Sequence, residues 1–154
     1  MSFSSYCIFP GRSRILRSVW ITRQIEFSAS HSCANPALTP AENRALYGED
    51  ANPHGHGHNY RLEVTLEGDP DPVTGMVVDL KVVKGILEKE VVDPMDHRHL
   101  NLEVPPFDRV VPTTENLAVE IWRRLEPRFL GLAARLRGIR LYETDELFVE
   151  YHGE

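Results

Sequence analysis

Two histidines separated by one residue, His56 and His58, lead directly into a stretch of alternating polar and apolar side chains at residues 59–67. Side chains alternate across an extended strand, so both imidazoles project from one face. A third imidazole from a neighbouring strand would complete a cup of three nitrogens, which is the ligand set of a catalytic zinc with its fourth position open. Gly57 lets another backbone approach closely. Alone, the pattern also fits a polar strand end with solvated imidazoles.

Alternation of apolar and polar residues recurs along the chain and predicts its strands. Four stretches show it, at residues 19–30, 59–67, 138–144 and 146–151. In the second stretch the apolar side chains all face one way, as in an antiparallel strand with one wet face. Turn residues then predict a hairpin that returns onto Met76–Val78, and the last two stretches predict a second hairpin.

Capping residues predict the first two helices. A capping box at Thr39–Glu42 starts a short helix that ends at Gly48. Asp79 caps a second helix, which runs from about Leu80 to Val92. Pro94 is expected to stop that helix, because proline cannot continue the hydrogen-bond ladder.

A third helix begins after a long loop, at Thr113 or Thr114, and breaks near Pro127. Together the elements predict an α+β fold over residues 19–154, a single domain in which two helices cover one face of a four-stranded antiparallel sheet. Such a sheet leaves two open edges and a partly covered face. We therefore expect the chain to form homo-oligomers, in which a site can lie between subunits.

Composition excludes several classes of protein. The formal net charge of −6 argues against nucleic acid as a partner, since nucleic-acid-binding proteins usually carry a basic face. No apolar run approaches the roughly 20 residues that cross a bilayer, so no membrane partner is expected. Two cysteines are too few for a disulfide framework, which indicates a reducing compartment and a cytoplasmic location.

Residues 1–18 differ from the rest of the chain and are predicted to be an N-terminal extension. They contain arginines and serines, and the first acidic residue of the chain is Glu26. They lack the apolar segment of a secretory signal. The composition is typical of an organellar transit peptide, and it also fits a non-functional extension or an upstream start codon.

Six short segments stand out between Trp20 and the C-terminus. They are residues 27–31 (FSASH), 52–60 (NPHGHGHNY), 71–76 (DPVTGM), 95–101 (MDHRHLN), 113–116 (TTEN) and 143–144 (ET). In sequence, order and spacing they resemble the superfamily of 6-pyruvoyl-tetrahydropterin synthase and 6-carboxytetrahydropterin synthase. Agreement of six motifs is far more specific than the histidine pair alone.

The resemblance implies the tunnelling fold (T-fold), in which the sheets of three subunits join as a barrel and two such trimers stack as a hexamer. It implies Zn²⁺ held by His31, His56 and His58, and 7,8-dihydroneopterin triphosphate as the substrate. The pyruvoyl branch expels triphosphate and isomerises the side chain, whereas the queuosine-pathway relative shortens it. A Lewis acid suits this chemistry, because chelation of vicinal hydroxyls acidifies the neighbouring C–H and O–H bonds.

The resemblance also implies the remaining site residues. Asp96 and His97 match the acid–base pair, in which a carboxylate fixes the tautomer of an imidazole that moves protons near neutral pH. Glu143 continues an apolar row, where an unpaired charge is costly; it matches the anchor that accepts the 2-amino and N3–H donors of the pterin. The segment that lines the pterin pocket matches Thr113, Thr114 and Glu115. Plain structural roles, such as an Asx turn, a strand-end glutamate and helix capping, are the alternatives.

One position departs from the family. The family's catalytic cysteine lies six residues before the first histidine of the pair, where this chain has Asp50. A carboxylate is a weaker base than a thiolate, with ordinary pKa values of ~3.9 and ~8.5 for the two acids. Asp50 or neighbouring Glu49 is expected to replace the cysteine. Cys33 is expected to be a small, partly buried thiol.

The departure leaves the reaction open among related activities. Elimination of triphosphate to give 6-pyruvoyl-tetrahydropterin is the first interpretation, because the long insert between His31 and His56 resembles the pyruvoyl branch. Asp50 also suits cleavage of the side chain to 6-hydroxymethyl-dihydropterin, since family members with a glutamate there resemble enzymes of that kind. The 6-carboxytetrahydropterin synthase activity and a non-catalytic pterin-binding oligomer are the further alternatives.

Overall fold

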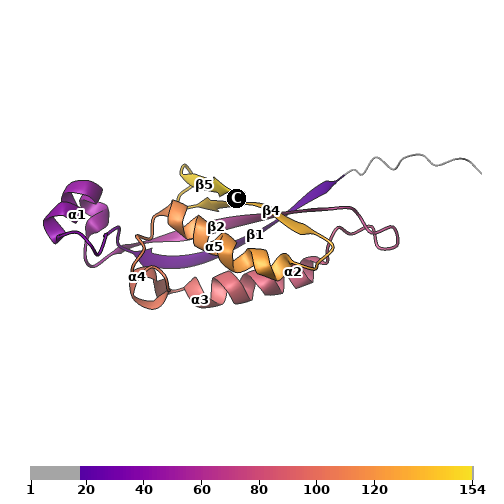
Figure 1. Ribbon diagram of the computed structural model, residues 1–154, viewed down its shortest axis with the longest axis horizontal. Coiled ribbons are helices and arrows are strands. Elements are labelled where there is room, and N and C mark those ends of the chain that lie inside the picture. Colours follow the sequence, from indigo (N-terminus) through magenta and orange to yellow (C-terminus); the bar gives the residue numbers. More distant parts are fainter. Residues whose placement is uncertain (1–17, 154) are drawn as a thin grey trace, which may run out of the picture.

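The computed structural model describes residues 18–153. The predicted N-terminal extension, residues 1–18, lies outside this range except for its last residue. Within the range one five-stranded sheet forms the body, in the order β3-β1-β2-β4-β5, with helices packed against it (Figure 1). The strands are β1 Val19–His31, β2 His56–Gly68, β3 Arg98–His99, β4 Arg135–Tyr142 and β5 Phe148–Tyr151.

β1 and β2 are long antiparallel partners that set the geometry of the site. β2 begins at His56, three residues earlier than predicted, and its register places His56 opposite His31 at the end of β1. On the buried face of the same two strands Phe27 stacks on Tyr60, with ring centroids 5.1 Å apart. The register therefore places the histidines on the face that forms the core, at one end of the sheet.

Two helical segments cover that face (Figure 1). The first runs through α2 Leu80–Leu87, the wider turn η2 Glu88–Val92 and α3 Asp93–Met95, and the second is α5 Thr114–Phe129. Their inward side chains include the fully buried Val83, Leu87, Leu117, Ile121 and Leu125. Burial of each such side chain contributes about 1.5–3 kcal/mol. The predicted α+β fold, with two helices on one face, is confirmed.

The edge of the sheet differs from the prediction. β3 adds a fifth strand, which pairs in parallel with Ala29 and Ser30 of β1, and the short helix α4 Leu100–Glu103 follows it. The prediction of four antiparallel strands is wrong here, because a two-residue strand is too short to show an alternation. β4 and β5 do form the predicted C-terminal hairpin.

The predicted hairpin after β2 is also wrong. No strand forms at Met76–Val78 in the part of the chain that the structure describes. The Asp71 carboxylate accepts the N–H groups of Val73 and Thr74 at 2.9 and 2.8 Å. Hydrogen bonds within residues 71–74 therefore hold the turn, and Val77 packs into the core instead of pairing with β2.

Two prolines interrupt their helices less than predicted. Pro94 does not stop the first segment, because it lies in the first turn of α3, directly after the wider turn η2. Pro127 lies in the last turn of α5, which continues to Phe129 without the predicted break. No helix between residues 18 and 153 has the length and apolar character needed to cross a membrane.

An excursion between β1 and β2 extends beyond the end of the sheet (Figure 1). α1 Pro40–Tyr47 begins at the predicted capping box of Thr39 and ends at Gly48, whose φ of 61° favours glycine. The 3-10 turn η1 Gly48–Ala51 follows directly and carries Asp50. The excursion thereby returns the chain to the start of β2 beside the histidines.

Candidate metal centre

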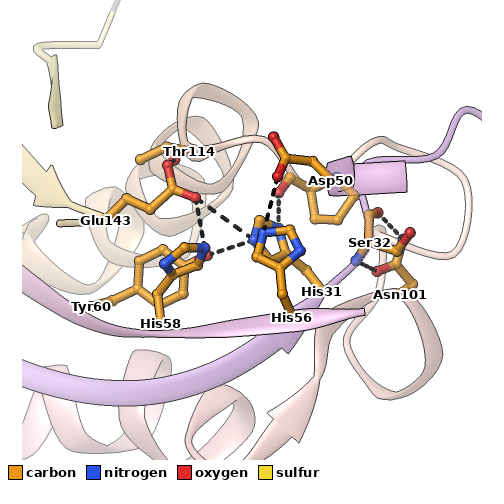
Figure 2. Close-up of polar contacts among 10 residues, drawn as sticks. His31, Ser32, Asp50, His56, His58, Tyr60, Asn101, Thr114 and Glu143 are labelled. Carbon is orange, nitrogen blue, oxygen red and sulfur yellow. Dashed lines mark hydrogen bonds and ion pairs between the residues drawn. The ribbon is translucent and has the colours of Figure 1, made fainter. Parts of the chain in front are cut away.

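Three histidines and one carboxylate gather at the end of β1 and β2 (Figure 2). One ligand atom from each of His31, His56, His58 and Glu143 lies within 4.8 Å of the others. The strand register explains the cluster, because His31 faces His56 across the strands and His58 follows on the same face of β2. The structure thus brings the predicted histidines together, and their role as metal ligands stays a prediction.

Burial keeps His31 neutral, and one hydrogen bond orients its ring. Its side chain is 1% exposed, and its Nδ1 lies 2.7 Å from the carbonyl oxygen of Pro112. Because a carbonyl only accepts, Nδ1 carries the proton and Nε2 offers its lone pair to the cluster. Burial lowers the pKa of His31 and that of His58. Both imidazoles are therefore neutral at pH 7, which is the form that binds a metal.

The donor set fits a zinc ion. Nε2 of His58 is buried and has no hydrogen-bond partner among the described residues. A buried nitrogen left without a partner costs about 1–3 kcal/mol, and a metal ion among the three histidines would supply that partner. Three imidazoles are also typical of catalytic zinc sites, whereas structural sites favour four ligands that include cysteine.

Asp50 lies beside the histidines, where the resemblance predicts a cysteine. Its Oδ1 is 3.8 Å from Nε2 of His56, and its backbone carbonyl accepts the N–H of Cys33 at 2.8 Å. Glu49 instead pairs with Arg44 at 2.6 Å, and its side chain points into solvent. Of the two carboxylates only that of Asp50 lies beside the histidines, and its role as the replacement for the thiol stays a prediction.

Cys33 lines the same cavity but is a poor base. Burial raises the pKa of its thiol to about 11, and the negative charges of Asp50, Glu143 and Glu115 act in the same direction. The thiol is consequently protonated at pH 7, whereas the reactive form of a cysteine is the thiolate. These observations agree with the expectation of a small, partly buried thiol.

Glu143 lies across the histidines from Asp50 (Figure 2). It directly follows the last residue of β4, and its Oε1 is 3.0 Å from Nε2 of His58. Its Oε2 accepts the hydroxyl hydrogen of Thr114 at 2.6 Å. The buried Thr114 thus fixes one carboxylate oxygen and leaves the other directed at the cluster.

The first residues of α5 form one wall of the cavity. Thr113, Thr114 and Glu115 line it together with the histidines, and its volume is about 370 Å³. Thr113 also accepts the N–H of Asn116 as the N-cap of α5. Capping and cavity lining, which the sequence offers as alternatives for Thr113, therefore occur together.

Tyr60 is a site residue that the sequence assigns only to the core. Its hydroxyl oxygen lies 3.4 Å from Nε2 of His31, and burial raises its pKa, so that it stays a neutral phenol. Its position two residues after His58, on the same face of β2, is the sequence signal that would have placed Tyr60 beside the histidines.

Asp96 and His97 form the predicted pair, but on the other face of the sheet. Asp96 Oδ2 is 2.8 Å from Nδ1 of His97, and Oδ1 accepts the N–H of Ser28 at 2.7 Å, which lowers the pKa of Asp96. His97 has a φ of 57°, is 83% exposed and lines a second cavity of about 420 Å³ with the polar-face residues Ser28 and Asn59; His58 also borders this cavity. Within one chain the pair does not line the cavity of the three histidines.

Comparison with known proteins identifies the family. The family described as 6-pyruvoyl tetrahydropterin synthase matches residues 20–154. The chain belongs to this family. A human relative named 6-pyruvoyl tetrahydrobiopterin synthase is 45% identical over 134 residues, which cover 87% of this chain and 91% of the relative. A relative of the same name from Poecilia reticulata is 47% identical over 136 residues, covering 88% and 90%.

A solved structure and a more distant sequence relative agree with this assignment. The structure of Caenorhabditis elegans 6-pyruvoyl tetrahydropterin synthase matches with a TM-score of 0.85 at 34% identity, covering 90% of this chain and 98% of that one. A 6-carboxy-5,6,7,8-tetrahydropterin synthase from Rickettsia typhi is 26% identical over 148 residues, covering 84% and 96%. The predicted family, T-fold and lyase class are confirmed.

Proposed function

We propose that this protein is a zinc-dependent lyase that acts on 7,8-dihydroneopterin triphosphate, expels triphosphate and forms 6-pyruvoyl-tetrahydropterin. The observation that carries the proposal is the cup of His31, His56 and His58, with Glu143 at its rim, inside a cavity of about 370 Å³. The names of the human and fish relatives support this choice of reaction.

Glu143 would anchor the pterin ring. A carboxylate accepts two parallel donors such as the 2-amino group and N3–H, and Thr114 holds this carboxylate through its hydroxyl. Thr113 and Glu115 line the same cavity and would contact the ring. When bound, Zn²⁺ would supply a Lewis acid that acidifies the bonds beside the vicinal hydroxyls of the substrate.

Asp50 would serve as the base that removes a side-chain proton. It lines the cavity and lies 3.8 Å from His56, on the side opposite Glu143. The carboxylate at this position also favours a second candidate, cleavage to 6-hydroxymethyl-dihydropterin, in which it accepts a hydroxyl proton in a retro-aldol step. The 6-carboxytetrahydropterin synthase reaction and a non-catalytic pterin-binding oligomer are the remaining candidates.

The Asp96–His97 pair would act from a neighbouring subunit. Neither residue of the pair lines the cavity of the three histidines in its own chain, and the exposed His97 lines a second cavity that also borders His58. β3 covers only Ala29 and Ser30 on the outer edge of β1, and β5 forms the other edge, so both edges suit pairing between copies. We infer a homo-oligomer, a trimer or hexamer, in a reducing, cytoplasmic compartment.

A product assay tests the proposal. Zinc-loaded protein is incubated with 7,8-dihydroneopterin triphosphate, and the pterins are identified by mass spectrometry. A pyruvoyl pterin, lost in Asp50→Asn, supports the proposed reaction and base, whereas a hydroxymethyl pterin assigns the second candidate. Asp50→Cys restores the family's thiol and serves as the matched variant. Substrate that binds unchanged, with binding lost in Glu143→Ala, would overturn the lyase assignment in favour of a binding protein.

A further inference from the structure

We propose that Glu143 is a fourth protein ligand of the metal in the substrate-free protein. The resting site is then a closed set of three imidazoles and one carboxylate, rather than a three-histidine site with a position left open. The inference rests on the metal site of the proposed function and not on the choice of substrate or reaction.

The spacing of the ligand atoms matches that of one coordination sphere. Oε1 of Glu143 lies 3.0 Å from Nε2 of His58 and 3.7 Å from Nε2 of His31. Zinc–nitrogen and zinc–oxygen bonds of about 2.0–2.2 Å place neighbouring ligand atoms of a tetrahedral site about 3.4 Å apart. These two distances bracket this value, and all four ligand atoms lie within 4.8 Å of one another, so small side-chain movements would bring the carboxylate oxygen into the place of a fourth ligand.

The short contact between Glu143 and His58 is not a hydrogen bond. Nε2 of His58 is buried and lacks a hydrogen-bond partner among the described residues, although Oε1 is only 3.0 Å away. A donor and an acceptor at this distance form a hydrogen bond when they are aligned. The two atoms approach without the alignment of a hydrogen bond, and a metal ion that both face would supply the interaction that the contact lacks.

Thr114 prepares the carboxylate for a single metal bond. Its hydroxyl donates to Oε2 at 2.6 Å, which leaves Oε1 as the free oxygen on the side of the histidines. The other acidic residues of the cavity, Asp50 and Glu115, lie outside the group of four. A carboxylate ligand also offsets part of the charge of a divalent ion in a half-buried site.

The arrangement implies an exchange when a pterin enters. In the substrate-free protein one oxygen of Glu143 accepts the hydroxyl hydrogen of Thr114, and the other oxygen coordinates the metal. Accepting two parallel N–H donors requires both oxygens to face the ring. Glu143 would therefore leave the metal as it takes up the pterin, so that the position opens only when substrate is present.

The test uses the whole protein without any pterin. Zinc affinity is measured by competition with a chromophoric chelator, and the ligand field is read from the visible absorption of the Co²⁺-loaded protein. We expect Glu143→Gln to lower zinc affinity at least about tenfold. Loss of a residue that only hydrogen-bonds to a metal ligand already lowers affinity by about 10–100-fold, and loss of a ligand should cost no less. The Co²⁺ spectrum should change with it.

Two further variants complete the test. Glu115→Gln removes a carboxylate from the same cavity and is expected to leave both readouts unchanged. Glu143→Asp keeps the charge but withdraws the oxygen by one methylene, and it should weaken zinc binding even if the glutamine variant folds poorly. Parent affinity and an unchanged Co²⁺ spectrum in either Glu143 variant would overturn the inference. Because no pterin is present, that result is independent of the product assay.

Discussion

The side-chain amide of Asn101 pairs with both backbone polar groups of Ser32, the residue that follows His31. Its Oδ1 accepts the Ser32 N–H at 2.9 Å, and its Nδ2 donates to the Ser32 carbonyl at 3.0 Å (Figure 2). The segment that contains Asn101 also bonds to an earlier residue of β1, because the N–H of His97 donates to the carbonyl of Ser28. Asn101 thus completes a row of contacts that fixes the backbone of β1 up to the histidine.

We predict that Asn101→Ala weakens metal binding without touching a ligand. The change leaves the N–H of the buried Ser32 without its partner, at a cost of about 1–3 kcal/mol, and removes one of the two hydrogen bonds to the Ser32 carbonyl, which also accepts the N–H of Ala34 at 3.0 Å. Zinc affinity should fall together with the thermal unfolding temperature. Asn59→Ala, on the exposed polar face, is the control and should change neither. Parent zinc affinity in Asn101→Ala would show that His31 is held by other contacts.

Gly55 is predicted to be irreplaceable in the turn that enters β2. Its φ is 73°, and a Cβ there would lie 2.8 Å from the carbonyl oxygen of His31 and 2.9 Å from Nε2 of His99. Gly55→Ala should therefore lower the free energy of unfolding by about 1–3 kcal/mol and displace the start of β2. In contrast, Gly85→Ala in α2 meets no atom within 4 Å and should be neutral or stabilising by up to about 1 kcal/mol. Urea unfolding of the two variants makes the comparison, and equal stabilities would contradict it.

The sequence predicts those parts of the molecule that depend on local patterns. Alternation and a two-residue spacing are enough to place His56 and His58 on one face, and the capping box at Thr39 fixes the start of α1. Local patterns fail where contacts are made over long distances. The carboxylate of Asp71 closes its loop by accepting two backbone N–H groups of the same loop. β3 forms because its two residues pair with the edge of β1, and no pattern within those two residues predicts a strand.

The placement of Asp96 and His97 shows the same limit within the site. Their adjacency predicts a hydrogen-bonded pair, which the structure contains. The side of the sheet on which the pair emerges depends on how the loop passes the edge of β1, and no residue pattern encodes that path. Asn101 is a comparable case, because its partner Ser32 lies 69 positions earlier in the chain.

If the pair serves a neighbouring subunit, two inactive variants should complement each other. His31→Ala lacks a ligand of the histidine cavity, and His97→Ala lacks the imidazole of the pair. In an oligomer reassembled from equal amounts of both, about one quarter of the shared sites would combine the two intact halves. Activity of the mixture should therefore approach a quarter of the parent activity. Mixed oligomers without activity would mean that the pair acts within its own chain.

The stability of the metal-free protein should depend on pH through the buried imidazoles. Burial lowers the pKa of His31 and His58 below the ordinary value of 6.5, so the unfolded chain takes up protons at a higher pH than the folded chain. Above pH 6.5 both states are neutral at these residues, and stability does not change on their account. As pH falls through 6.5 towards the lowered values, the unfolded state binds more protons, and the free energy of unfolding decreases.

The free energy of unfolding decreases by at most about 1.4 kcal/mol per pH unit for each histidine that remains neutral in the folded state. Urea unfolding of chelator-treated protein between about pH 8 and about pH 5.5 measures it. His31→Gln, which removes one of the two buried titrating imidazoles, should show a shallower decline than the parent. Stability that stays constant, or rises, as the pH is lowered would contradict the assignment of neutral imidazoles to the empty cluster.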